Sequence, residues 1–156
     1  MPLSSDLVKT AEERCELKPS ITEADLRRAT SDCYYAMFHA ICETLVSVLG
    51  SDAGNDAIRE AYDVLYRQPD HAYLDKRCRE VSRLDFDPRL KAFARQISEM
   101  QNKRHQADYY PLAKFSRTNV FNDVAKTSAT VRSFHDTAQA ERVRFAFFVS
   151  LRGRKD

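Results

Sequence analysis

The side chains of this sequence that could exchange a proton or bind a phosphate group gather in two short segments. Residues 26–40 read LRRATSDCYYAMFHA, and residues 101–111 read QNKRHQADYYP. Arginine is always charged and can bind a phosphate through two nitrogens, whereas histidine can exchange a proton near neutral pH. Together these residue types could bind RNA or a nucleotide and could assist metal-free cleavage of a phosphodiester. The candidates are Tyr35, His39, Arg104, His105, Asp108 and Tyr109.

The candidate catalytic group combines a cation with an acid–base residue. Arg104 would supply the cation that stabilises a phosphorane, and Asp108 could orient the acid–base partner. His39 is the first candidate for that partner, with His105 and Tyr109 as alternatives. Tyr109 is the poorest general base of the three, because the usual pKa of a tyrosine is about 10.

The same residues also allow a purely structural interpretation. Arg104 and Asp108 are four positions apart, so they could simply form an ion pair along a helix. Tyr35 could pack in a core or interface instead of stacking on a base, and His39 could be a hydrogen-bonded core histidine. The residue types alone leave both interpretations open.

Both segments are expected to lie on long helices, because the chain is poor in residues that interrupt helices. It contains 3 glycines and 5 prolines in 156 residues, too few for many hairpins or a glycine-rich phosphate loop. A capping box at Ser20–Glu23 predicts the start of one helix, which should continue to Gly50 with apolar residues spaced by three and four. Asp87 as the cap and Pro88 in the first turn predict the start of the other, which should run to about Tyr109.

Further helices are expected from similar signals. Ser4 or Ser5 should cap a first helix that runs to about Glu16, and Lys18-Pro19 should end it. Three more helices should begin at the polar residues that can serve as caps. These caps are Asp52–Asn55, Asp70, and Ser116 or Thr118.

The C-terminal segment, residues 142–152, alternates apolar and polar residues as a strand would. No second strand is predicted for it to pair with, so we expect it to form the end of the last helix. Its large apolar side chains should either pad the core or form a contact between subunits. They belong to Val143, Phe145, Phe147, Val149 and Leu151.

Composition indicates a single, mostly helical domain that spans residues 1–156. Hydrophobic residues make up 43% and charged residues 31%, as in ordinary folded domains. No apolar run approaches the roughly 18 residues of a membrane span, and the N-terminus lacks the apolar stretch of a signal peptide, so we expect a cytoplasmic protein with no membrane partner. The cysteine and histidine spacings supply no set of four metal ligands, so we expect neither a metal nor a cofactor.

Charge is divided unevenly between the two parts of the chain. Residues 1–88 carry a net charge of −6, and residues 89–156 carry +8. The basic part could face phosphate groups or an acidic partner. Alternatively, the two parts could neutralise each other across the fold.

The two segments together resemble the motifs of the HEPN superfamily, most closely those of its small stand-alone bacterial members. Residues 28–40 fit the pattern R-x-x-S-x-x-Y-Y-A-x-F-H-A, and residues 104–109 fit R-x-x-A-D-Y. The resemblance covers about residues 20–135 and leaves residues 141–156 as an apolar and basic tail. It implies an all-α, up-and-down bundle, here of five to six helices, that forms a homodimer.

The resemblance also implies how the two segments are arranged. They should face each other, so that Arg104 points into a polar cleft shared with residues 34–39 and stays partly exposed. Ser31 should line the same groove as Arg104. Arg104→Ala should therefore leave folding nearly intact, because a partly exposed ion pair with Asp108 contributes little.

The sequence departs from the family's catalytic pattern at one position. In catalytic members an arginine is followed, after four to six residues, by a histidine. Counting from Arg104, the corresponding positions hold Tyr109, Tyr110 and Pro111. His105 cannot take over, because one residue along a helix turns a side chain by about 100°. Any ribonuclease activity should therefore be weakened.

The resemblance thus implies a HEPN-like protein that binds RNA or a nucleotide through Arg104, Tyr109, Tyr35 and Ser31. Such a protein could retain weak, metal-independent endoribonuclease activity of the toxin–antitoxin type. The alternative is a non-catalytic dimeric interaction module that partners a small nucleotidyltransferase antitoxin. The missing histidine favours the alternative, whereas the basic second part and the retained R-x-x-A-D-Y favour the first interpretation.

Overall fold

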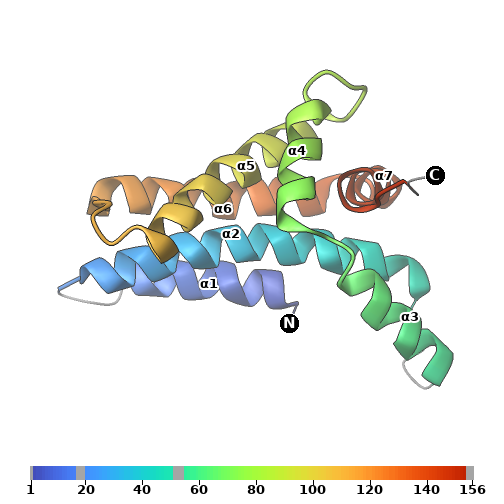
Figure 1. Cartoon of the computed structure of the whole chain (residues 1–156), viewed down its shortest axis with the longest axis horizontal. Coiled ribbons are helices and arrows are strands. Elements are labelled where there is room, and N and C mark those ends of the chain that lie inside the picture. The colour runs from blue at the N-terminus through green and yellow to red at the C-terminus, as the bar shows by residue number, and fades with distance from the viewer. Residues whose placement is uncertain (1, 17–19, 51–54, 154–156) are drawn as a thin grey trace.

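The computed structural model describes residues 2–16, 20–50 and 55–153, and within them every regular element is helical. Figure 1 shows the arrangement, and the expected all-α helical bundle is confirmed. The elements in chain order are α1 (Leu3–Glu16), α2 (Glu23–Val46), the 3-10 turn η1 (Ser47–Leu49), α3 (Asp56–Tyr66), α4 (His71–Val81), α5 (Pro88–Tyr109), α6 (Arg117–Asp136) and α7 (Gln139–Ser150).

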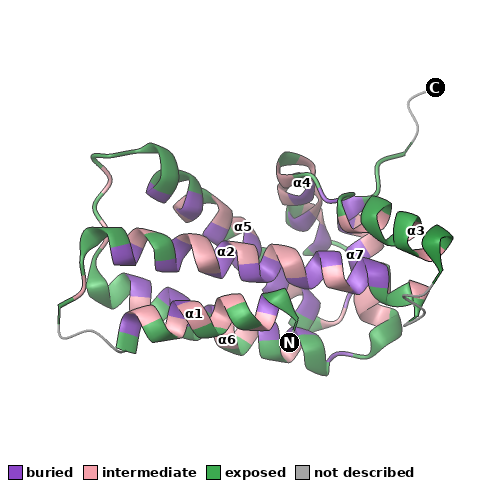
Figure 2. Ribbon diagram, turned by 90° about the horizontal axis from the view of Figure 1, so that it is seen from below, coloured by how far each residue is buried: buried purple, intermediate pink, exposed green. Residues whose placement is uncertain are grey.

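Helix α2 is the centre of the bundle. It contacts α1, α5 and α6 along its length and reaches α3 and α7 near its C-terminal end (Figure 1). Fourteen of its 24 residues are buried, so it is enclosed on most sides rather than amphipathic (Figure 2). Ala29, Ala36 and Ala40 are fully buried, and such small side chains allow neighbouring helices to approach closely. Residues on α2 therefore have their positions fixed by several other helices at once.

The start of α2 differs from the predicted capping box by two residues. The cap is Thr22, whose hydroxyl oxygen accepts a hydrogen bond from the backbone nitrogen of Asp25 at 3.1 Å. The Asp25 carboxylate in turn accepts one from the Thr22 backbone nitrogen at 3.1 Å. This reciprocal pair satisfies the free amides at the helix start, so the predicted box at Ser20–Glu23 is wrong. At the other end Gly50 has a φ of 71°, which suits a glycine that follows a helical segment.

Several other helix starts agree with the sequence. The side chains of Asn55, Asp70, Asp87 and Ser116 each accept a hydrogen bond from a backbone nitrogen of the helix that they cap. The predicted end of the first helix at Lys18-Pro19 lies outside the described residues. So does Asp52, the first residue of the predicted cap Asp52–Asn55.

Helix α1 is not capped by Ser4 or Ser5 as predicted. It begins at Leu3, and Ser4 is a fully buried helical residue. The Ser4 backbone nitrogen donates a hydrogen bond of 2.9 Å to the carboxylate of Glu43 on α2, and the Ser4 hydroxyl donates a second one of 2.5 Å. A carboxylate from another helix thus replaces the cap, which is favourable because anions are stabilised at helix N-termini.

The C-terminal segment is helical, but it is a separate helix rather than the end of the preceding one. Helix α6 stops at Asp136, and Thr137 and Ala138 are extended before α7 begins. The Arg142 guanidinium donates to the carbonyl oxygens of His135 and Thr137, which the broken helix leaves free. This break makes seven helices among the described residues instead of the expected five to six. The buried side chains of α7 belong to Phe145, Ala146, Val149 and Ser150, so the segment pads the core.

No helix in the described part of the chain is both long enough and apolar enough to span a membrane.

Arg27 on α2 holds the loop between α5 and α6 in place. Its guanidinium donates hydrogen bonds of 2.5–3.5 Å to five carbonyl oxygens, and it lies 3.3 Å from the Glu23 carboxylate. It also lies 5.0 Å from the centre of the Phe115 ring. Carbonyl groups at the end of a helix need partners from outside that helix, and one arginine supplies them here. The carbonyl oxygens belong to Gln106, Ala107, Tyr110, Pro111 and Ala113.

Replacing Arg27 by alanine should lower the free energy of unfolding by about 2–3 kcal/mol, because hydrogen bonds from a charged donor are worth roughly 1.5–3 kcal/mol and their loss leaves carbonyl groups without partners. Urea unfolding measures this change. Arg28→Ala is the matched control, since Arg28 is the exposed neighbour on the same helix and its loss should cost less than about 0.5 kcal/mol. Equal losses in the two variants would contradict the role assigned to Arg27.

Candidate functional site

The two segments singled out by the sequence face each other across the contact between α2 and α5. Arg104 on α5 lies with its guanidinium 5.1 Å from the centre of the Tyr34 ring and 5.7 Å from that of Tyr35, both on α2. A cation over the face of an aromatic ring is attracted by it, more strongly where water is excluded. The expected proximity of Arg104 to the aromatic part of α2 is therefore present.

Arg104 is more deeply buried than the sequence suggested. Only 9% of the residue is exposed, so the expectation of a partly exposed side chain is wrong. The reason is that Tyr34, which is fully buried, and Tyr35 cover the guanidinium. Removing the side chain would leave a cavity, so Arg104→Ala should destabilise the fold rather than leave it intact.

The hydrogen-bonding capacity of Arg104 is only partly used. Its one ion pair within the described ranges, with Asp108, is loose, at 3.5 Å between nitrogen and oxygen. Its Nε is buried and has no hydrogen-bond partner among the described residues. Asp108 is itself held by Ser31, whose hydroxyl donates a hydrogen bond of 2.7 Å to the other carboxylate oxygen. The predicted residues Arg104, Asp108, Ser31 and Tyr35 thus form one cluster.

His71, at the start of α4, joins this cluster although no sequence pattern had pointed to it. Its Nδ1 lies 2.6 Å from the hydroxyl oxygen of Tyr34, and its ring stacks on Phe38 with the ring centres 4.4 Å apart. Its backbone oxygen accepts a hydrogen bond of 3.1 Å from the Gln101 side chain. The only sequence signal is the Asp70 cap, which places His71 in the first turn of a helix. A helix cap does not indicate against which other helix the first turn will pack.

The surroundings of His71 favour its neutral form. Burial lowers the pKa of His71 below its usual value, and the positive charge of Arg104 lowers it further. The negative charge of Asp70 acts in the opposite direction, but it does not prevail. His71 is therefore an uncharged ring beside a charged guanidinium at neutral pH.

The other three candidates make their contacts elsewhere. His39 is bonded through Nδ1 to the hydroxyl of Tyr66 on α3 at 2.8 Å, and burial lowers its pKa. His105 lies on the outer side of α5 with its ring 5.0 Å from the ring of Tyr109, which is 63% exposed. No hydrogen bond or ion pair joins any of the three to Arg104 in the described part of the chain.

A groove of about 480 Å³ opens beside the cluster, between the start of α2 and the end of α5. Ser31, Tyr35 and Asp108 line it together with the exposed Arg28. Arg104 itself does not line the groove, so a ligand in it would meet the cluster at Ser31, Tyr35 and Asp108.

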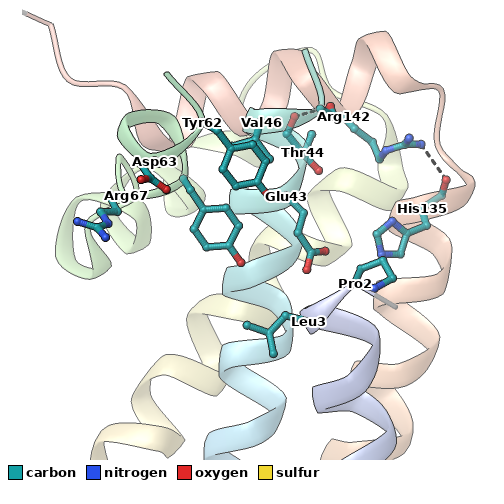
Figure 3. Close-up of a pocket in the computed structure, with 12 residues that line it drawn as sticks. Pro2, Leu3, Glu43, Thr44, Val46, Tyr62, Asp63, Arg67, His135 and Arg142 are labelled. Atoms are coloured by element: carbon teal, nitrogen blue, oxygen red, sulfur yellow. Dashed lines mark hydrogen bonds between the residues drawn. The ribbon is translucent and has the colours of Figure 1, made fainter. Parts of the chain in front are cut away.

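A second cavity, of about 640 Å³, lies at the opposite end of α2 (Figure 3). The carboxylate of Glu43, which lines this cavity, already accepts two hydrogen bonds from Ser4. Arg142, also in the lining, donates to the carbonyl oxygen of His135 at 2.8 Å, a bond drawn in Figure 3. Because Glu43 and Arg142 have protein partners, whereas the buried Nε of Arg104 has none among the described residues, this cavity is less suited to a phosphate than the cluster around Arg104.

No group of three or more metal-binding side chains occurs among the described residues. No protein-family model, curated protein or solved structure matches this chain. The chemistry of the site has therefore to be inferred from its own geometry.

The lowered pKa values of His39 and His71 predict how stability changes with pH. The usual pKa of histidine, about 6.5, applies to the unfolded chain, so between pH 6.5 and the lower folded-state values the unfolded state binds more protons. The free energy of unfolding should therefore fall as the pH is lowered from 7.5 to 5.5. Urea unfolding at the two pH values measures the difference.

His71→Asn provides the comparison for this prediction. The variant lacks one of the titrating groups, so its loss of stability between pH 7.5 and 5.5 should be smaller than that of the natural protein, whatever its absolute stability. An unchanged or larger pH dependence would show that His71 is not held in its neutral form.

Proposed function

We propose that the cluster around Arg104 binds a phosphate group of RNA or of a nucleotide, as the resemblance to HEPN proteins implies. The observation that carries the proposal is the buried, under-used guanidinium, with its Nε unpartnered and its one ion pair at 3.5 Å. A buried arginine normally has its donors satisfied, and phosphate oxygens are acceptors that suit its planar geometry. The side chain keeps 11% of its surface exposed, so a phosphate would approach from one side.

His71 supports the proposal as a second donor. The buried hydroxyl of Tyr34 has the Nδ1 of His71 as its hydrogen-bond partner among the described residues, and we take the hydroxyl as the donor, because its own proton would otherwise be buried without an acceptor. In a neutral imidazole the proton then sits on Nε2. No described residue binds this Nε2, which therefore has a proton left to donate to a bound ligand.

The same tautomer favours binding over cleavage. A general base for the 2′-hydroxyl of RNA needs a ring nitrogen without a proton at the reacting side. In His71 that nitrogen is Nδ1, and Tyr34 occupies it. We therefore place RNA or nucleotide binding first and weak, metal-independent ribonuclease activity second. A toxin–antitoxin role remains a part of this proposal that the resemblance implies.

The second candidate function is an interaction module that forms a homodimer or partners a small nucleotidyltransferase. It is favoured by the exposed apolar side chains on η1 and α3, where Val48 is 47%, Tyr62 43% and Val64 54% exposed. Helix α3 has no buried residue (Figure 2), although the spacing of its apolar residues puts them on one face. Such a face is typical of a surface that another protein covers.

Substituting Arg104 by lysine should weaken binding of a short, fluorescently labelled oligoribonucleotide by about 1–3 kcal/mol, since lysine keeps the charge but loses the bidentate geometry. Arg104→Gln also removes the charge. The slope of log affinity against log salt concentration should then become shallower by about 0.7, the value for one phosphate contact of a single strand. Fluorescence anisotropy at several salt concentrations measures both effects.

Arg95→Gln is the matched control, because Arg95 is exposed on the same helix and nine residues away, on the opposite face. It should change affinity much less than the Arg104 variants. Circular dichroism must show that all variants are folded, as lysine and glutamine fill part of the space that alanine would leave empty. Equal effects of Arg95→Gln and Arg104→Gln, or no binding by the natural protein, would support the interaction module instead.

A further inference from the structure

We propose that a groove between the end of α5 and the loop that follows it, residues 110–114, holds an unpaired base of single-stranded RNA. This inference rests on the proposed phosphate site and names its substrate class. The groove has a volume of about 750 Å³. Its lining includes Asn102, His105, Gln106, Tyr110, Leu112 and Lys114.

Exposed flat rings form one wall of this groove. Tyr110 is 55% exposed, and its ring centre lies 5.7 Å from that of His105. The neighbouring Tyr109 is 63% exposed, and its ring centre lies 5.0 Å from that of His105. Exposed aromatic rings can stack on any base, because every base has an aromatic face.

The loop holds these rings in place before any ligand arrives. Arg27 binds five carbonyl oxygens of the loop and of the end of α5, so the backbone beneath Tyr110 is fixed. The loop nevertheless keeps Leu112 92% exposed to water. Rigid exposure of apolar and aromatic side chains is unfavourable unless a ligand covers them, and it reduces the entropy that binding costs.

The polar side chains of the groove suit the edge of a base. Asn102 and Gln106 are four residues apart on α5, so they share one face of the helix. Each amide presents a donor and an acceptor side by side, the arrangement that pairs with the N6 and N7 edge of adenine. A base stacked on Tyr110 would have this edge within reach of the two amides.

The charge around the groove favours a nucleic acid over an apolar protein surface. Lys114 lines the groove itself, and Arg117 follows three residues later in the chain. Phosphate groups on either side of a bound base would meet this positive charge. A protein partner with an apolar surface would leave the charges of Lys114 and Arg117 without a match.

The groove can be reached from the phosphate site along the surface of α5. Successive residues of a helix are turned by about 100°, so His105 and Tyr109 lie between the side that carries Arg104 and the side that carries Asn102. A strand whose phosphate contacts Arg104 would therefore pass over the rings of His105 and Tyr109 before its next base enters the groove. The two sites would together bind successive nucleotides of one strand.

The test compares a labelled hexaadenylate ribonucleotide with a chain of six abasic phosphodiester units of the same length. Tyr110→Ala and His105→Ala should each weaken hexaadenylate binding about tenfold, the size expected for one lost stacking contact, and should leave abasic binding unchanged. Tyr110→Phe keeps the ring and should retain the affinity.

Arg104→Lys should weaken binding of both probes. Tyr62→Ala on α3, which removes another exposed tyrosine, is the control and should affect neither.

Three outcomes would overturn the inference in ways that can be told apart. If Tyr110→Ala behaves like Tyr62→Ala while Arg104→Lys weakens both probes, the base groove is wrong and the phosphate site stands. If the natural protein binds neither probe, the proposed function fails as well. If the natural protein is a dimer and Leu112→Ser makes it a monomer in sedimentation, a second copy of the chain covers the groove.

Discussion

A guanidinium that is nine-tenths buried must be stabilised by its neighbours, and Arg104 imposes this requirement on α2, α4 and α5 together. The rings of Tyr34 and Tyr35 cover its faces, and Asp108 gives it a distant counter-charge. The hydroxyl of Tyr34 in turn forms a hydrogen bond with Nδ1 of His71 on α4. The positions of the side chains in the candidate site therefore follow from the burial of the Arg104 charge, which is only partly paired.

Two residues of helix α2, Arg27 and Tyr34, position the second part of α5 and the loop that follows it. Arg27 and Tyr34 are seven residues apart, two helical turns, so they lie on the same side of the helix toward α5. Tyr34 contacts Arg104 within α5, and Arg27 fixes the carbonyl groups at the end of α5 and in its loop. The proposed phosphate site and the proposed base groove are thus positioned by one helix, which the other helices hold in place on most of its sides.

Much of the fold could be predicted from local signals, because caps and apolar spacing act within a few residues. Asp70 and Asp87 are examples, since each caps the helix that the sequence assigned to it. The alternating pattern near Phe145 misleads, because the buried residues of α7 share one helical face while the partly buried Phe147 and Phe148 add apolar residues outside it. The burial of Arg104 and the approach of His71 depend on how distant helices pack, and no local pattern records that.

The most direct measurement of the central claim is the NMR signal of the Arg104 Nε–H group, assigned by its disappearance in Arg104→Lys. This proton is buried and unpartnered in the free protein, so a phosphate that completes the hydrogen bonding of the guanidinium must change its surroundings. Titration with a short oligoribonucleotide should shift this signal progressively until binding is saturated. An unchanged signal at saturation, while signals elsewhere shift, would contradict phosphate binding at Arg104.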